Sequence, residues 1–300
     1  MNAQDIACAI AQQHAEMLAG EPQNHAQAQQ KSDSALTPEM AGVLQGCRML
    51  GFLEHDAQCV MHAWEQQSLR LGGFDLHAWP VHPSDFGVAA GFRDNAFAPC
   101  PQALGLYAVL PDAQWVGRMA RAGVPTVQLR FKSQDAHAIA NEVRAAVAAV
   151  QGTQALLFIN DHWQAAIESG AYGVHLGQED MADAPLQTIR AAGLRLGLST
   201  HGYAEMLRAD AVSPSYIALG AVFPTTLKRM ATAPQGMGRL QAYARLMQQH
   251  PLVAIGGIDE SRLSEVLQTG VGSVAMVRAI TDAPDPQIRA QTLMEIMRAS

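Results

Sequence analysis

The chain has 300 residues, of which 49 % are hydrophobic and 16 % charged, and its formal net charge is −7. This composition indicates a folded globular protein of one or two domains and excludes a disordered chain. The negative charge argues against nucleic-acid binding. No apolar run approaches the roughly 18 residues of a transmembrane helix, so no membrane association is expected.

Four cysteines lie in the first hundred residues, at Cys8, Cys47, Cys59 and Cys100, and none forms a Cys-x-x-Cys pair. They indicate neither a disulfide framework nor a zinc site, and they fit a reducing compartment. The first residues include an acid where a signal peptide has basic residues. We therefore expect a cytoplasmic protein.

Residues 1–104 differ in character from the rest of the chain. The opening is rich in Gln and His and predicts a frayed helix followed by a mobile linker. Between Thr37 and Gly73, apolar residues recur at helical spacing and predict two or three amphipathic helices. Residues 74–87 predict an irregular loop, in which His77 and His82 are expected to be surface or packing residues. We expect a small helical extension, and the sequence does not indicate its role.

From Gly105 to the end, short apolar runs alternate with amphipathic segments. The predicted strands are Leu106–Leu110, Thr126–Phe131, Leu156–Ile159, Gly173–Leu176, Arg195–Leu198, Tyr216–Leu219, Leu252–Ile255 and Ser273–Val277. Predicted helices follow at 115–122, 135–150, 163–169, 185–192, 204–209, 238–249, 261–268 and 286–297. Eight β–α repeats in residues 105–300 predict a (β/α)8 TIM barrel. A doubly wound open sheet is the alternative, but the glycine-rich sequence typical of its first turn is missing.

Polar residues alternate along the second predicted strand, at Gln128, Arg130 and Lys132. With a side-chain period of two, all three face the interior of the barrel, and Phe131 faces the helices. Polar residues in a barrel are costly unless they bind a polar ligand. The structural alternative is an internal salt-bridge network with acids on a neighbouring strand.

Two aspartates follow the third and fourth predicted strands, Asp161 and Asp180. Neighbouring strands lie about 4.8 Å apart, so the two carboxylates can share one cation. Taken singly, Asp161 would be the cap of the helix that begins at His162, and Asp180 a solvated loop acid. Together, at adjacent strand ends, they favour a metal site.

The remaining strand ends also carry groups suited to ligands. Ser199 and His201 share one loop without a GxSxG sequence, so they predict ligand binding or helix capping instead of a hydrolase triad. Lys228, in the loop after the sixth strand, predicts an anion-binding site. Gly256-Gly257 and Val277 end the seventh and eighth strands, where such barrels bind phosphate.

In chain order these motifs resemble the thiamine-phosphate synthase family. The matching motifs are Gln128-x-Arg130-x-Lys132, IND at 159–161, HLGQED at 175–180, GLS at 197–199, FPTTLK at 223–228, APQG at 233–236 and IGGI at 255–258. The resemblance covers all eight repeats. It implies a magnesium-dependent transferase of thiamine biosynthesis. Its substrates would be 4-amino-2-methyl-5-(diphosphomethyl)pyrimidine and 4-methyl-5-(2-phosphooxyethyl)thiazole, and its products thiamine phosphate and diphosphate.

The resemblance also implies three groups of site residues. Those that hold the pyrimidine diphosphate are Gln128, Arg130, Lys132, Asn160, Ser199 and Lys228. Those that hold Mg2+ are Asp161 and Asp180. Those that bind the thiazole phosphate are Thr225, Gly257 and Val277. Direct catalytic roles fall to Arg130, Lys132, Ser199 and Lys228.

Three residues depart from the family pattern. Phe131 stands where the family usually has an acid, Leu227 where it has a second threonine, and Arg278 where it has a serine. Two alternatives to the synthase remain open. One is a thiazole tautomerase of the same fold that uses His201 for proton transfer, and the other is a non-catalytic barrel that binds thiamine precursors. The sequence leaves open whether the protein is a homo-oligomer.

Overall fold

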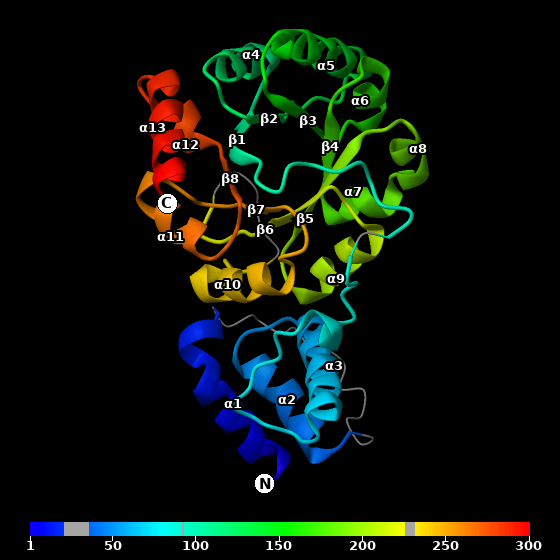
Figure 1. Ribbon diagram of the computed structural model, residues 1–300, viewed down its shortest axis with the longest axis vertical. Helices are drawn as coiled ribbons and strands as arrows, with labels where there is room; N and C mark the ends of the chain where they lie inside the picture. The colour runs from blue at the N-terminus through cyan, green and yellow to red at the C-terminus, as the bar shows by residue number, and fades with distance from the viewer. Residues whose placement is uncertain (21–35, 92, 226–231) are drawn as a thin grey trace.

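The computed structural model describes residues 1–20, 36–91, 93–225 and 232–300. In these ranges the chain forms a closed parallel barrel of eight strands, preceded by a helical region that lies at one end of the molecule (Figure 1). The predicted (β/α)8 fold with a mostly helical N-terminal extension is therefore confirmed. No helix in the described ranges is both long and apolar enough to cross a membrane.

Each strand of the barrel pairs in parallel with the next, and the last pairs with the first. The strands are β1 Gly105–Leu110, β2 Thr126–Leu129, β3 Leu156–Asn160, β4 Gly173–Leu176, β5 Arg195–Thr200, β6 Tyr216–Leu219, β7 Leu252–Ala254 and β8 Ser273–Met276. Closure is fixed by the register of β1, in which Tyr107 pairs with Thr126 on one side and Ala108 with Met276 on the other. All eight predicted strands are present, and their ends differ from the prediction by at most two residues.

Helices surround the barrel in the predicted gaps. They are α4 Ala113–Arg121, α5 Ala136–Val150, α6 Trp163–Ser169, α8 Leu186–Ala191, α9 Tyr203–Val212, α10 Gly236–Leu246, α11 Leu263–Gln268 and α13 Pro286–Ala299. Two short elements were not predicted, namely α7 Gln178–Asp183 and α12 Arg278–Thr281, and the helix predicted at 261–268 begins as a 3-10 turn at Glu260–Arg262. The loop expected at Asp180 is wrong, because two acids in the first turn of α7 favour a helix there.

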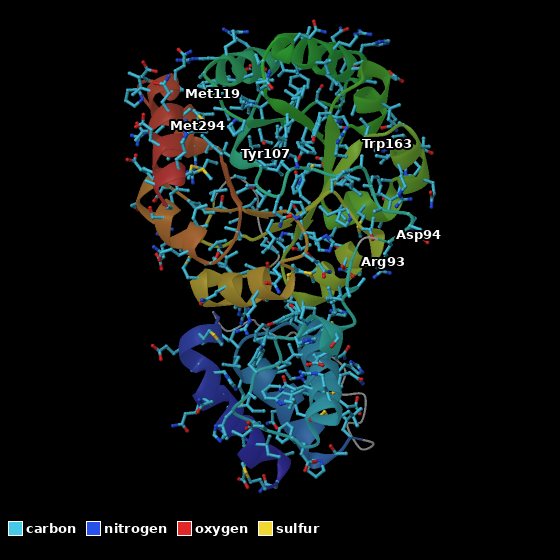
Figure 2. All side chains as sticks on the ribbon, in the orientation of Figure 1. Arg93, Asp94, Tyr107, Met119, Trp163 and Met294 are labelled. Carbon is cyan, nitrogen blue, oxygen red and sulfur yellow. The ribbon has the colours of Figure 1, made fainter. Side chains whose placement is uncertain are left out.

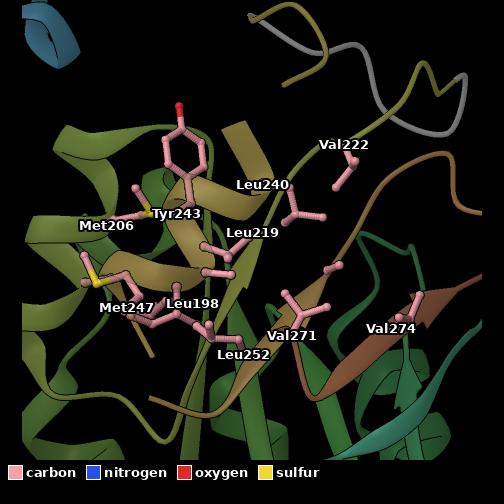
Figure 3. Packing of buried hydrophobic residues seen from close by; sticks show 14 of the residues in the cluster. Leu198, Met206, Leu219, Val222, Leu240, Tyr243, Met247, Leu252, Val271 and Val274 are labelled. Carbon is pink, nitrogen blue, oxygen red and sulfur yellow. The ribbon is translucent and has the colours of Figure 1, made fainter. Parts of the chain in front are cut away.

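The alternation of side chains along the strands separates two apolar clusters. Residues that face outward pack under the helices, as Leu198, Leu219 and Leu252 do beside α9 and α10 (Figure 3). Residues that face inward form a smaller cluster around Tyr107 and Tyr216. Tyr107 is labelled in Figure 2. The inner cluster fills the barrel, and inward-facing polar residues such as Gln128 and Ser199 lie above it, toward the carboxyl ends of the strands.

In residues 1–20 and 36–91, the N-terminal region forms three helices and a short 3-10 turn. They are α1 Ala3–Leu18, α2 Pro38–Met49, α3 Glu54–Leu71 and the turn Pro83–Phe86. The expectation of a frayed first helix is wrong, because Asn2 caps α1 and Ile6, Ile10 and Leu18 are buried. The linker expected after α1 falls at 21–35, outside the described residues. His77 and His82 are exposed, as expected.

This region docks on α9 and α10 of the barrel through buried contacts. The Arg239 guanidinium on α10 donates to the backbone carbonyls of Leu18 at 2.9 Å and Leu50 at 2.7 Å. On α9, Tyr203 stacks on Phe86 of the N-terminal region. The first turn of α9 receives its cap from the same region, because Asp56 accepts a hydrogen bond from a backbone N–H there at 2.8 Å. The extension is thus packed against the barrel and shares hydrogen bonds with it.

Candidate active site

A cavity of about 360 Å³ lies at the carboxyl ends of the barrel strands, and every strand contributes to its lining. The predicted site residues that line it are Gln128, Arg130, Lys132, Asn160, Asp161, Asp180, Ser199, Thr225 and Val277. Gly256 lines the cavity in place of its neighbour Gly257. Lys228 and Leu227 lie outside the described residues. The structure thus brings together groups that are up to 149 positions apart in the sequence, from Gln128 to Val277.

The row of polar residues on the β2 segment becomes more exposed to solvent from the interior of the barrel to its mouth. Gln128 is buried, Arg130 is half-buried and Lys132 is exposed, while Phe131 packs against the core under the helices. Phe131 therefore faces away from the cavity, as expected. The salt-bridge alternative is not found in the described residues, where neither Arg130 nor Lys132 forms an ion pair. The row offers amide and cationic groups to a ligand.

Asp161 follows β3 in the left-handed region, with φ of 63°. The side chain of Asn160 donates a hydrogen bond to its carboxylate. The capping interpretation is wrong, because the N-cap of α6 is His162 and no side chain caps that helix. Although Asp161 is open to the cavity, the cavity walls displace part of its water, and this desolvation raises its pKa. The nearby Asp180 carboxylate raises that pKa further.

The donor set around Asp161 suits a hard cation. Asp180 stands in the first turn of α7, and a Cβ on Gly177 would lie 3.0 Å from its Oδ2, so glycine makes room for this carboxylate. Within the described ranges no group of three or more His, Cys, Asp or Glu side chains could hold a metal. Two carboxylates and a neighbouring Asn160 amide oxygen fit Mg2+, which commonly takes one or two protein carboxylates and completes its shell with phosphates and water.

A hydrogen-bond chain crosses the barrel below this rim. The Gln128 amide donates to Tyr107, whose hydroxyl lies 2.7 Å from that of Tyr216. Tyr216 contacts Nδ1 of His175, and Nε2 of His175 lies 2.8 Å from Oγ of Ser199. Sequence reasoning missed the two tyrosines and gave His175 no role. The signal was present, since all three stand at inward-facing positions of their strands.

Ser199 lies near the carboxyl end of β5 and His201 follows the strand directly, and the capping interpretation is wrong for both. The N-cap of α9 is Gly202, and a residue of the N-terminal region supplies the side-chain cap. Gln178 of α7 holds the backbone of Ser199 through a 2.7 Å bond to its carbonyl. His201 lines the cavity and bonds Glu205 through Nδ1 at 2.7 Å. Burial is the largest single influence and raises the pKa of Glu205, but the hydrogen bonds from His201 and the electrostatic attraction of His201 and Arg208 together outweigh it, so the net pKa is lowered.

The opposite rim is shaped by Gly256-Gly257 after β7. Both have positive φ, of 95° and 66°, and a Cβ on Gly257 would lie only 2.5 Å from the Pro224 carbonyl oxygen. Glycine is therefore required where this turn meets the loop after β6, in which Thr225 lies. Thr225 and Val277 line the cavity beside it, and Arg278 is exposed at the start of α12.

A larger cavity, of about 520 Å³, lies at the amino-terminal ends of β1, β2 and β8. It is lined by residues such as Leu106, Pro125 and Met294, and it contains none of the predicted site residues. Because catalytic groups of TIM barrels lie at the carboxyl ends of the strands, the smaller cavity is the candidate active site.

Comparisons with known proteins agree with this geometry. Residues 106–280 match the family model described as thiamine monophosphate synthase. The thiamine-phosphate synthase of Neisseria meningitidis serogroup B is 56 % identical over 191 residues, which are 64 % of this chain and 93 % of that relative. The thiamine-phosphate synthase of Cronobacter sakazakii is 52 % identical over 200 residues, covering 67 % of this chain and 95 % of the relative.

Among solved structures, thiamine phosphate pyrophosphorylase from Pyrococcus furiosus superposes with a TM-score of 0.59 at 28 % identity, covering 65 % of this chain and 96 % of that one. The 3-hexulose-6-phosphate synthase of Salmonella typhimurium, at 14 % identity and a TM-score of 0.53, covers 65 % of this chain and 99 % of its own and shares only the fold. The sequence match spans the whole barrel and includes the strands that carry the cavity residues. The chain belongs to the thiamine monophosphate synthase family.

Proposed function

We propose that this chain is a thiamine-phosphate synthase, and that the cavity of its barrel joins the pyrimidine diphosphate to the thiazole phosphate. The observation that carries the proposal is the single cavity, in which the polar row of β2, the Asp161–Asp180 pair and the glycine turn after β7 meet. Identity of 56 % to a curated synthase over 191 residues supports the same reaction.

The pyrimidine diphosphate lies along the β2 row in this proposal. Gln128 is buried and uncharged and suits the heterocycle, while Arg130 and Lys132 nearer the mouth suit the diphosphate. Asn160 adds an amide at the next strand end, and Ser199 contacts the substrate from β5. Lys228, outside the described residues, is assigned to the phosphates by its motif.

The thiazole phosphate occupies the other side of the cavity. Gly256-Gly257 leaves backbone N–H groups accessible to an anion, Thr225 supplies a hydroxyl, and the start of α12 at Val277 closes that side. The two substrates then face one another across the mouth of the barrel. The residues of the N-terminal region that the structure describes contribute none of the lining of this cavity, and the proposal gives them no direct part in the reaction.

Charge neutralisation drives the chemistry. Mg2+, held by Asp161 and Asp180, would supply positive charge for the departing diphosphate. Arg130, Lys132 and Lys228 add to it as fixed cations. The carbon–oxygen bond between the pyrimidine methylene and the diphosphate breaks, and the electron pair leaves with the diphosphate. The lone pair of the thiazole nitrogen then forms the new carbon–nitrogen bond, so no general base is required.

The two alternative functions are less well supported. A tautomerase would need His201 as a proton carrier, but this imidazole is bonded to Glu205 and a tautomerase has no use for the Asp161–Asp180 pair. A non-catalytic barrel is disfavoured because the matching relatives are synthases. The proposed synthase accounts for the cations and the carboxylates in one reaction.

The direct experiment mixes the purified full-length protein with both substrates, with and without Mg2+. We expect thiamine phosphate and diphosphate to form in equal amounts only when all three components are present. Omission of the thiazole phosphate tests whether diphosphate release depends on the nucleophile. Failure to form thiamine phosphate under these conditions, in a protein that is folded by circular dichroism, would refute the proposal.

A further inference from the structure

The hydrogen-bond chain inside the barrel links two residues that the proposed function places on the pyrimidine. It runs from Gln128 through Tyr107, Tyr216 and His175 to Ser199, with distances of 3.0, 2.7, 2.7 and 2.8 Å. Gln128 and Ser199 are its ends. The three residues between them have no role in the chemistry described above, and both tyrosines are almost fully buried.

The chain has a direction because each phenol has only one proton to donate. Burial raises the pKa of Tyr107 and of Tyr216, so both are neutral at physiological pH. The Gln128 Nε2 donates to the Tyr107 hydroxyl. Either phenol could donate in the bond between Tyr107 and Tyr216, but both hydroxyl protons have an acceptor within the chain only when Tyr107 donates to Tyr216. In this arrangement the Tyr216 proton is left for Nδ1 of His175, 2.7 Å away.

This direction sets the state of both ends of the chain. With Nδ1 as an acceptor, a neutral His175 carries its proton on Nε2 and donates it to Oγ of Ser199. Ser199 accepts that bond and keeps its own proton for a ligand. At the other end, Gln128 has used Nε2 within the chain, so its Oε1 is the group left to accept a hydrogen bond.

Packing holds the central hydroxyl in place. The His175 ring stacks on the Tyr216 ring at 5.7 Å and 21°, and Phe158 meets Tyr216 edge-on at 5.1 Å. A Cβ at Gly197 would lie 2.1 Å from Cζ of Tyr216, so the glycine of the GLS motif is required by this ring. Such close packing keeps the Tyr216 hydroxyl between its two partners.

We propose that Tyr107 and Tyr216 are positioning residues that make the site present a hydroxyl donor at Ser199 and a carbonyl acceptor at Gln128. This inference rests on the proposed function. A 4-aminopyrimidine carries the complementary pair, a ring nitrogen that accepts and an amino group that donates. A 4-oxo analogue carries a ring N–H and a carbonyl, which is the reverse pattern and leaves buried polar groups mismatched. The tyrosines thus select the amino form of the substrate.

The first test measures the His175 tautomer in the full-length protein without substrates. Its ring 15N resonances are assigned by their loss in His175→Asn. We expect a protonated Nε2 and an unprotonated Nδ1, and a shift toward the other tautomer in Tyr216→Phe, which lacks the donor to Nδ1. A proton on Nδ1 in the unaltered protein would overturn the proposal. This readout does not depend on enzymatic activity.

The second test compares the 4-amino substrate with its 4-oxo analogue. Tyr216→Phe should lower kcat/KM for the 4-amino substrate about tenfold. The ratio of kcat/KM for the 4-amino substrate to kcat/KM for the 4-oxo analogue should also fall about tenfold, and the KM for thiazole phosphate should stay unchanged. Tyr107→Phe should show a smaller loss, since Tyr216 can still donate to His175. The control Tyr203→Phe removes another buried hydroxyl, bonded to Trp79 outside the barrel interior, and should leave the preference unchanged.

The possible outcomes distinguish a failure of this inference from a failure of the proposed function. An unchanged preference in Tyr216→Phe, or equal losses for both substrates, would overturn the role of the tyrosines even if the enzyme is a synthase. If the unaltered protein makes no thiamine phosphate, the proposed function fails, and the tautomer measurement still decides the direction of the chain. Both variants are compared at equal folded fraction, measured by circular dichroism.

Discussion

The mouth of the barrel and the docking surface on α9 and α10 both use charged side chains, but in opposite ways. At the mouth, Arg130 forms no ion pair with a described residue, and Asp161 lies near a second carboxylate. At the docking surface, Arg239 is buried and donates to two backbone carbonyls. Arg130 and Asp161 at the mouth are therefore placed to interact with a ligand, whereas Arg239 at the docking surface already interacts with groups of the protein.

Two aspartates show the contrast in their pKa values. For Asp161, desolvation and the neighbouring Asp180 both raise the pKa, so its charged form is disfavoured in the folded protein. For Asp210 on α9, burial raises the pKa but hydrogen bonds, the strongest from His250, outweigh it and lower the net value. The difference indicates that residues at the mouth serve a ligand at some cost in stability, and that the docking surface serves stability.

The largest expected effect is on turnover at the mouth. Asp161→Asn and Asp180→Asn should each lower kcat about 10²–10³-fold, because each removes charge from the group that neutralises the diphosphate. Asn tolerates the left-handed backbone of Asp161, so the fold should persist. The double variant should lose less than the product of the single losses, since both residues act through one ion.

Magnesium titrations supply the control for that prediction. A raised Mg2+ concentration should partly restore each single variant and leave the double variant inactive. Steady-state kinetics at several Mg2+ concentrations, with circular dichroism as a check on folding, make the measurement. Turnover like that of the unaltered protein, independent of Mg2+, would remove the metal site from the mouth.

The next effect is on stability at the docking surface. Arg239→Met should lower the free energy of unfolding by about 2–5 kcal/mol, because it leaves the carbonyls of Leu18 and Leu50 without this buried donor. The control Arg245→Met changes an exposed arginine of the same helix and should have little effect. Urea denaturation measures both, and kcat per folded molecule should stay unchanged. A large loss of kcat with normal stability would contradict the division between the two regions.

The pH dependence of stability should differ in sign between the two aspartates. Asp210 has a lowered pKa, so its stabilising contribution is present above the unfolded value of 3.8 and is lost as the pH falls through the folded pKa. Asp161 has a raised pKa, so its ionisation opposes folding as the pH rises through that value. At neutral pH without Mg2+ or substrates, Asp210→Asn should therefore be less stable than the unaltered protein, and Asp161→Asn slightly more stable.

Denaturant midpoints measured between pH 3 and pH 8 test these signs, and both differences should shrink at the acidic end, where the carboxylates are protonated. If Asp161→Asn is less stable than the unaltered protein at neutral pH, the Asp161 carboxylate stabilises the fold. The contrast between the mouth and the docking surface would then be wrong.

The smallest expected effect on activity is from removal of the N-terminal region. The fragment 104–300 keeps every described cavity residue. The Neisseria meningitidis relative matches this chain over 191 residues, which are 93 % of its own length. We therefore predict that it retains synthase activity, with a lower melting temperature because Tyr203 and Arg239 lose their partners. Activity assays on the fragment at a temperature below its melting point make the test. A folded fragment without turnover would show that the extension completes the site.

Much of the architecture was determined by the sequence alone. Eight apolar runs separated by amphipathic segments are local signals, and they located all eight strands. Parallel closure then places the carboxyl ends of those strands together, so residues such as Lys132, Asp161 and Asp180 could be assigned to one site from their positions at strand ends. The departure at Phe131 was also predictable, because alternation fixes the face of a strand residue.

The tertiary structure alone decided which side chains meet across the barrel and across the docking surface. Tyr107 and Tyr216 are 109 positions apart and meet only because the barrel closes. Asp56 caps a helix 148 positions later, so the local search for a cap at Ser199 and His201 was bound to fail. Such contacts leave no periodic trace in the sequence, because they depend on the distance between elements in space and not on spacing along the chain.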